Sequence, residues 1–235
     1  MASSEDTEAE RSLSELFDHC MKLYTEVKDS KAPSNDPNLQ SAVRTAICAL
    51  EDLTRRVSAA GLFSTNEAAD ELPTSSLRFL LLPALLGELT SKLARDDRLQ
   101  VISVAEVYYR DFVQRCRDYG LTDAAIPRAR AEAAAEPARQ PRPPTMRDLA
   151  TMSKQREERL RRYRQQKELD KQLAALQEAM RRPSPDEETV RSYQLTLVLQ
   201  AVSRAVDELN SLELEKPILE HMQQLKTRGG GAAPE

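Results

Sequence analysis

The sequence predicts an all-α fold, with antiparallel helical hairpins followed by two long helices. Hydrophobic residues recur at intervals of three and four along most of the chain, which is the spacing of amphipathic helices. Only six glycines occur in 235 residues, and aromatic residues make up 4%, a composition that favours helices over sheets. No stretch has the pattern of a strand, and no nucleotide-binding glycine loop is present.

Four helices are predicted in the first half of the chain, with apolar stripes over residues 13–27, 39–57, 77–93 and 97–119. Ser12 and Glu15 form a capping-box pattern before the first helix, and Gly61 and Gly120 follow the second and the fourth as caps. The third is apolar almost all round its axis, so we expect it to be buried, with a kink or break at Pro83. Short connections indicate two hairpins side by side, a packing that resembles tetratricopeptide arrays without their repeat pattern.

The second half of the chain is predicted as a linker and two long helices. Residues 122–144 hold five of the thirteen prolines and indicate a flexible or semi-rigid connector. Helix is expected over 146–182 and 189–215, after which Pro217 interrupts a short C-terminal helix. The expected organisation is a disordered start at 1–9, one helical domain at 10–226 and a disordered tail at 227–235.

No catalytic or metal-binding arrangement emerges from the residues. The three cysteines lie far apart, and with only two histidines in the chain a Cys/His metal cluster cannot be assembled. Neither histidine has a nucleophile motif beside it, and adjacent carboxylates such as Glu157 and Glu158 point about 100° apart along a helix. The sequence therefore predicts a protein that is not an enzyme and holds no metal or cofactor.

Charge and hydropathy do not favour nucleic acid or membrane as partners. The formal net charge is -4, and the most apolar run, residues 77–89, is too short to cross a bilayer and contains a proline. The acidic N-terminus has no apolar signal region. We therefore expect a cytoplasmic, monomeric protein with reduced cysteines.

The stretch QREERLRRYRQQKELD, residues 155–170, allows three interpretations. It is a solvated helix if its charges only form i,i+4 pairs such as Glu157–Arg161, each contributing about 0.2–0.5 kcal/mol. It is a nucleic-acid arm if aromatic residues stack on bases, but Tyr163 is the one aromatic residue available. It is a docking face for a protein if its apolar and basic residues share one side.

The helical wheel favours the third interpretation. Four residues of the proximal half fall on one side, with Arg156 among them and Arg159 beside it, namely Leu149, Met152, Leu160 and Tyr163. Four residues of the distal half fall almost opposite, namely Leu169, Leu173, Leu176 and Met180. We expect the distal half to pack on the last helix. The proximal half then offers Lys154, Arg156, Arg159 and Tyr163 to a protein bearing carboxylates, because an arginine fork binds a carboxylate through two hydrogen bonds.

Two stretches resemble the Tap/alpha-4 family of regulatory partners of type 2A protein phosphatases. They are LFSTNEAADELPTSSLRFLLLPALLGELTSK at 62–92 and MSKQREERLRRYRQQKELDKQL at 152–173, with a looser match at 191–219. The resemblance covers about residues 13–219. It implies a tetratricopeptide-like helical domain and two basic positions, matched by Arg156 and Arg159, that contact the phosphatase catalytic subunit. Lysine is the usual family residue at the second position, so Arg159 keeps the charge but not its geometry.

The resemblance also implies a function. Family members are non-catalytic adaptors that bind the catalytic subunit and stabilise or sequester it in TOR and nutrient signalling. It implies a ubiquitin-binding segment as well, but residues 42–61 lack the acidic run and are basic at Arg55 and Arg56, which argues against that activity here. The family pattern continues into an acidic tail that this sequence does not include. A general helical interaction scaffold with no phosphatase role is the alternative.

Overall fold

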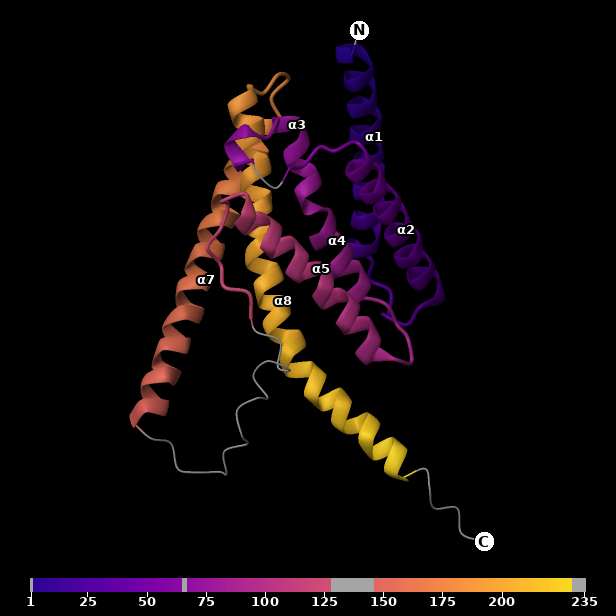
Figure 1. The fold of residues 1–235 in the computed structure, drawn as a ribbon, viewed down its shortest axis with the longest axis vertical. Helices are drawn as coiled ribbons and strands as arrows, with labels where there is room; N and C mark the ends of the chain where they lie inside the picture. The colour runs from indigo at the N-terminus through magenta and orange to yellow at the C-terminus, as the bar shows by residue number, and fades with distance from the viewer. Residues whose placement is uncertain (1, 65–66, 128–145, 230–235) are drawn as a thin grey trace.

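A computed structural model describes residues 2–64, 67–127 and 146–229, and its elements are helices without any strand in these ranges (Figure 1). The α-helices are α1 (Ala2–Asp29), α2 (Pro37–Ala59), α3 (Thr74–Leu77), α4 (Leu82–Ser91), α5 (Arg98–Asp118), α7 (Met146–Met180) and α8 (Glu187–Gly229). Two short 3₁₀ helices, η1 (Ala69–Glu71) and η2 (Arg78–Leu81), lie between α2 and α4. The all-α prediction is confirmed. No helix in the described ranges has the length and low charge of a membrane span.

The first hairpin, α1 and α2, forms from the stripes that the sequence predicts. Five residues of each stripe are buried, namely Leu13, Phe17, Cys20, Tyr24 and Val27 in α1 and Val43, Ala46, Leu50, Leu53 and Val57 in α2. Asp36 caps α2, because its carboxylate accepts hydrogen bonds from the backbone N–H groups of Asn38 and Leu39 at 2.9 and 3.0 Å. Each helix therefore turns one apolar side to the core.

The third predicted helix is buried and broken, as expected from its composition and from Pro83. It consists of α3, η2 and α4, and the change to 3₁₀ geometry comes just before Pro83, which lies in the first turn of α4. A proline fits there because the first turn has no intrahelical partner for its missing N–H. Farther along, a Cβ atom on Gly87 would lie 2.9 Å from the ring of Tyr109, so glycine allows α4 and α5 to approach closely.

The last helix corrects the prediction that Pro217 interrupts it. α8 continues through Pro217 to Gly229. A proline removes one backbone hydrogen bond and crowds the preceding turn, but side chains next to it hold α8 on α5. The ion pairs are Arg110–Glu213 at 3.4 Å, Arg98–Glu215 at 2.8 Å and Glu106–Lys216. These pairs join residues more than a hundred positions apart, so local propensity could not reveal them.

The other end of α8 holds the connection between the two hairpins. Arg191 donates hydrogen bonds to the backbone carbonyl oxygens of Leu72 and Ala69, both at 2.8 Å. These two contacts give the backbone carbonyl groups at η1 and directly after it a side-chain donor from α8. The long C-terminal helix is therefore fastened to the N-terminal array at both ends of the array.

The linker and the chain ends differ in part from the expected organisation. The backbone of residues 2–9 is helical in α1, whose acidic first turns suit the positive end of the helix dipole. Of the expected linker 122–144, the first residues pack on the body, since Ala124 and Ile126 are partly buried and Arg110 donates to the carbonyl oxygen of Pro127 at 2.5 Å. Residues 128–144 and 230–235 lie outside the described ranges.

Candidate protein-docking face on α7

The distal half of α7 packs against α8, as the helical wheel predicts. Leu173 is buried, and Leu169, Leu176 and Met180 are partly buried. The two helices also share a hydrogen bond in which the Gln200 amide donates to Asp170 at 2.6 Å. Figure 1 shows α7 and α8 side by side near their connecting turn and apart at their far ends. The distal half therefore fixes α7 while the proximal half extends away from the body.

The proximal half of α7 exposes the residues that the wheel places on its other face. Leu160 is 47% exposed, Tyr163 is 56% exposed, and Arg156 is exposed as well. At about 100° per residue these three side chains lie within about 60° of one another around the helix axis. The structure therefore brings an arginine, a leucine and a tyrosine onto one exposed face. The backbone at Lys154 and Arg159 is helical, but the side chains of these two residues lie outside the described part.

Lys167 adds charge beside the exposed tyrosine. Its ammonium nitrogen lies 5.0 Å from the centroid of the Tyr163 ring, within the range of a cation–π contact. A hydrogen bond with Tyr163 and the attraction of its oxygen raise the pKa of Lys167 above its ordinary value. The lysine is therefore cationic at neutral pH and widens the basic face towards the middle of α7.

Arg162 is a site residue that the sequence reasoning missed. Its side chain turns to α8 and forms an ion pair with Asp207 at 3.6 Å. A signal for this direction was present, because Arg162 falls within about 20° of both Leu169 and Leu173 on the wheel. Its Nε atom is buried and has no hydrogen-bond partner among the residues that the structure describes. The basic residues of α7 thus divide into an inward anchor and an outward face.

The exposed face can bind a carboxylate-bearing protein surface. Arg156 presents a planar cation with five donors, and Leu160 and Tyr163 supply adjacent apolar area, a combination common at the centres of protein interfaces. No cluster of three metal-ligating side chains occurs in the described ranges.

Comparison with known proteins decides the family. A model of the TAP42-like family matches residues 13–235. The chain belongs to the TAP42-like family. The match includes both stretches, 62–92 and 152–173, on which the resemblance was based, and it confirms that resemblance.

Curated TAP42-like relatives match most of this chain at low identity. The human protein "Immunoglobulin-binding protein 1 family member C" is 28% identical, with 88% of this chain and 61% of that protein covered. The "Serine/threonine-protein phosphatase 4 regulatory subunit ppfr-4" of Caenorhabditis elegans is 27% identical, with 94% and 66% covered. The rice "PP2A regulatory subunit TAP46" is 25% identical, with 98% and 56% covered. The chain therefore spans less than two thirds of the length of these relatives.

A solved TAP42-like structure has the same fold. "The Structure of Tap42 Alpha4 Subunit" superposes with a TM-score of 0.67 at 20% sequence identity, covering 90% of this chain and 99% of that one. At this identity the likeness establishes the arrangement of helices. The tetratricopeptide-like array with long C-terminal helices is thus a property that this chain shares with a solved family member.

Proposed function

We propose that this chain is a non-catalytic adaptor that binds the catalytic subunit of a type 2A-like protein phosphatase. The observation that carries the proposal is the exposed face of Arg156, Leu160 and Tyr163, which lies inside the family stretch 152–173. The names of the nematode and rice relatives, regulatory subunits of phosphatase 4 and of PP2A, support the same partner. Arg159 falls about 60° from Arg156 around the helix axis and belongs to the proposed face, whereas Lys154 falls about 160° from Arg156 and lies off it.

The proposed consequence of binding is stabilisation or sequestration of the catalytic subunit within TOR and nutrient signalling. An adaptor that binds one conformer of its partner increases the population of that conformer by mass action. Arginine forks suit this task because they bind carboxylates with defined geometry. We do not extend the proposal to ubiquitin, because Asp52 of α2 is engaged by Arg55 at 3.3 Å and by Arg56 at 2.7 Å.

We propose a monomer that works in the cytoplasm, and the state of the cysteines supports that compartment. Cys20, Cys48 and Cys116 are all unpaired thiols. Burial raises the pKa of Cys116 to about 12, so this thiol is inert and serves as a small apolar core residue. Unpaired thiols persist where the compartment is reducing.

Charge reversal tests the proposed function. The double variant Arg156→Glu/Arg159→Glu is expected to weaken binding of the purified phosphatase catalytic subunit at least about thirtyfold, because it places like charges against partner carboxylates. The measurement is the Kd by titration calorimetry, with helicity and melting temperature recorded for each variant. Arg181→Glu/Arg182→Glu, in the exposed turn directly after the same helix, is the matched control and is expected to bind normally.

The outcomes separate the competing interpretations. Unchanged binding by the Arg156→Glu/Arg159→Glu variant would show that the site is elsewhere. Loss of helicity in that variant would show that the arginines are structural. A wild-type chain that fails to bind any type 2A-like catalytic subunit would favour the general helical scaffold.

A further inference from the structure

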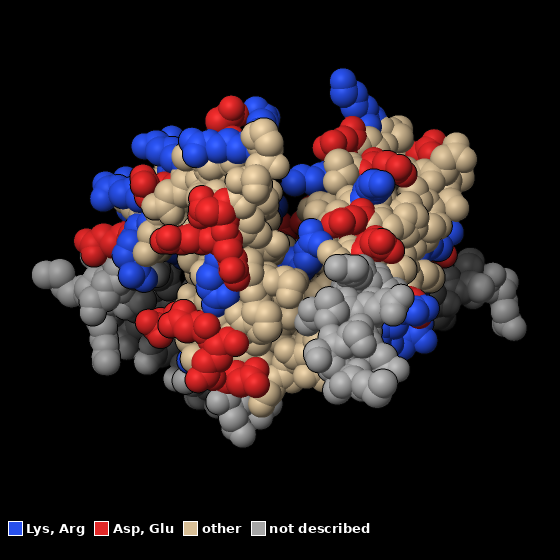
Figure 2. Space-filling model, turned by 90° about the horizontal axis from the view of Figure 1, so that it is seen from above, with Lys and Arg blue, Asp and Glu red and all other residues tan. Residues whose placement is uncertain are grey.

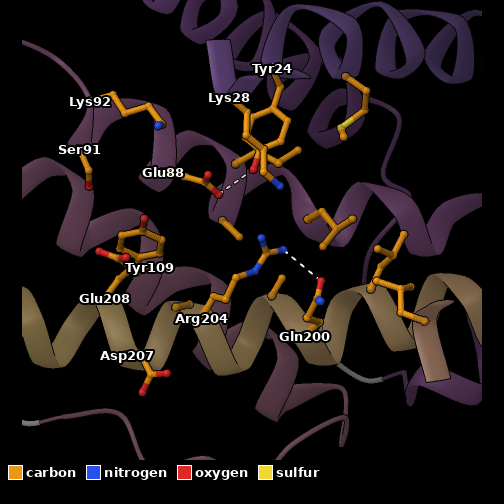
Figure 3. Close-up of a pocket in the computed structure, with 18 of the residues that line it drawn as sticks. Tyr24, Lys28, Glu88, Ser91, Lys92, Tyr109, Gln200, Arg204, Asp207 and Glu208 are labelled. Atoms are coloured by element: carbon orange, nitrogen blue, oxygen red, sulfur yellow. Dashed lines mark hydrogen bonds between the residues drawn. The ribbon is translucent and has the colours of Figure 1, made fainter. Parts of the chain in front are cut away.

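An open groove of about 800 Å³ lies between α1, α4 and α8, away from the exposed face of α7 (Figure 3). Each of these helices turns one face to the groove, because the lining residues recur at intervals of three and four. On α8 they extend from Tyr193 to Glu208, which at 1.5 Å per residue is about 22 Å. Figure 2 shows the surface hollowed between its two halves, with charged side chains at the rim. The groove is long enough and open enough to receive one further helix alongside α1 and α8.

The floor of the groove is apolar. Leu81, Leu85 and Ala201 line it. Each is less than a tenth exposed, because most of its side chain packs in the core and only a small part faces the groove. At one end the Tyr24 hydroxyl donates to Glu88 at 2.7 Å, which engages that carboxylate. Repulsion by Glu88 and burial both contribute to raising the pKa of Tyr24, so the hydroxyl keeps its proton at neutral pH.

Arg204 is the polar group in the groove with the most unused hydrogen-bonding capacity. It is partly buried, it points into the groove, and among described residues its one hydrogen bond goes to Gln200 at 3.4 Å (Figure 3). A guanidinium carries five donors, so most of those of Arg204 remain unused by the residues that the structure describes. Lys28 and Lys92 add positive charge at the rim. A carboxylate is the complementary ligand.

Acidic residues also line the groove, and two of them already have a hydrogen-bond or ion-pair partner in the chain. Glu88 accepts from Tyr24, and Asp207 forms the ion pair with Arg162. The third is Glu208, whose pKa is raised by burial and by neighbouring carboxylates, Glu88 foremost. Arg204 is therefore the group of this surface that can best bind an anion.

We propose that the groove receives an amphipathic helix of the phosphatase catalytic subunit, whose apolar side covers the floor and whose carboxylate pairs with Arg204. This inference rests on the proposed function and extends it by a second contact region. Recognition of an amphipathic helix in an apolar groove uses residues spaced as these are. About 22 Å of groove seats roughly four helical turns.

The size of the α7 face supports a second contact region. A stable interface buries about 800 Å² on each partner and involves some twenty residues a side. In the part of α7 whose side chains the structure describes, the exposed face presents a few residues, namely Arg156, Leu160, Tyr163 and Lys167. Asp207 lines the groove, and its ion-pair partner Arg162 directly precedes Tyr163 in the chain. One partner can therefore cover both surfaces.

Two variants of the full chain test the groove with the phosphatase catalytic subunit as the binding partner. Arg204→Glu is expected to weaken binding at least about tenfold, because it replaces the anion receptor by an anion. Gln177→Trp, at an exposed position that lines the groove from α7, narrows the groove without entering the core and is expected to weaken binding as well. Arg55→Glu on α2 is the matched control, expected to stay within about twofold of wild type.

The result decides between this inference and the proposed function. The inference about the groove is overturned if Gln177→Trp and a folded Arg204→Glu both bind normally. If binding is at the same time lost in Arg156→Glu/Arg159→Glu, the proposed function still holds. Absence of binding by the wild type overturns both. A wild-type dimer in sedimentation that Arg204→Glu dissociates assigns the groove to a second copy and also overturns the inference. If Arg204→Glu fails to fold, the affinity of Gln177→Trp decides.

Discussion

The Phe112→Ala variant is expected to lose about 3–5 kcal/mol of unfolding free energy. Phe112 is 0% exposed and is the largest of the fully buried side chains, on the helix α5 that packs against both α4 and α8. Removing its ring forfeits the transfer free energy of the apolar atoms and leaves a cavity that the surrounding helices fill only in part. The melting temperature should fall by about 6–20 °C in a chain of this size.

An exposed position on the same helix provides the control for Phe112. Val107→Ala changes a side chain that is 65% exposed, so its effect should stay within about 0.5 kcal/mol. Urea unfolding followed by circular dichroism gives both values. A loss below about 1 kcal/mol for Phe112→Ala, or an equal loss for Val107→Ala, would contradict the packing of α5 between its two neighbours.

The second large effect is expected at Glu106, which joins α5 to α8. Its carboxylate is 9% exposed, and it accepts from Arg110 at 2.7 Å and from Lys216 beside Pro217. Glu106→Gln should lower the unfolding free energy by about 2–3 kcal/mol, because Lys216 loses the carboxylate that it contacts and Arg110 keeps only the longer ion pair with Glu213. Combining it with Lys216→Met in a double-mutant cycle should give a coupling energy of about 1–3 kcal/mol. A coupling near zero would mean that the pair does not hold α8.

The effect of Glu106 should depend on pH in a defined direction. Burial raises the pKa of this carboxyl, but hydrogen bonds from Lys216 and Arg110 outweigh burial and leave the pKa below its ordinary value. A lowered pKa in the folded state means that the stabilisation is complete above the unfolded value of about 4.3 and is lost as pH falls through the folded value. The stability difference between wild type and Glu106→Gln should therefore shrink from pH 6 to pH 3. A constant difference would exclude this role.

The elements of the fold that follow from local pattern could be predicted from the sequence. Apolar spacing located the helices, and the composition around Pro83 indicated a buried, broken helix, because both depend on residues within a few turns. The continuation of α8 through Pro217 could not be predicted. It depends on Lys216 meeting Glu106, a pair 110 positions apart in the sequence. Contacts of that kind arise only when the helices have been placed against each other.

The candidate site divides in the same way. Two opposed faces on α7 follow from the helical wheel, and the structure confirms that Leu173 is buried while Leu160 and Tyr163 are exposed. The inward direction of Arg162 was readable from its register with Leu173. The groove around Arg204 was not, because it exists through the separation of α1 from α8. The sequence records the faces of each helix but not the space left between them.

Hydrogen exchange with and without the phosphatase catalytic subunit tests the central claim most directly. The proximal half of α7 extends from the body with exposed side chains, so its amides should exchange readily in the free chain and slow on binding. The account predicts slower exchange around Arg156–Tyr163 in the complex, and little change in α2, which faces away from both proposed surfaces. Unchanged exchange along the proximal half of α7 in a saturated complex would contradict the assignment of this helix as the docking face.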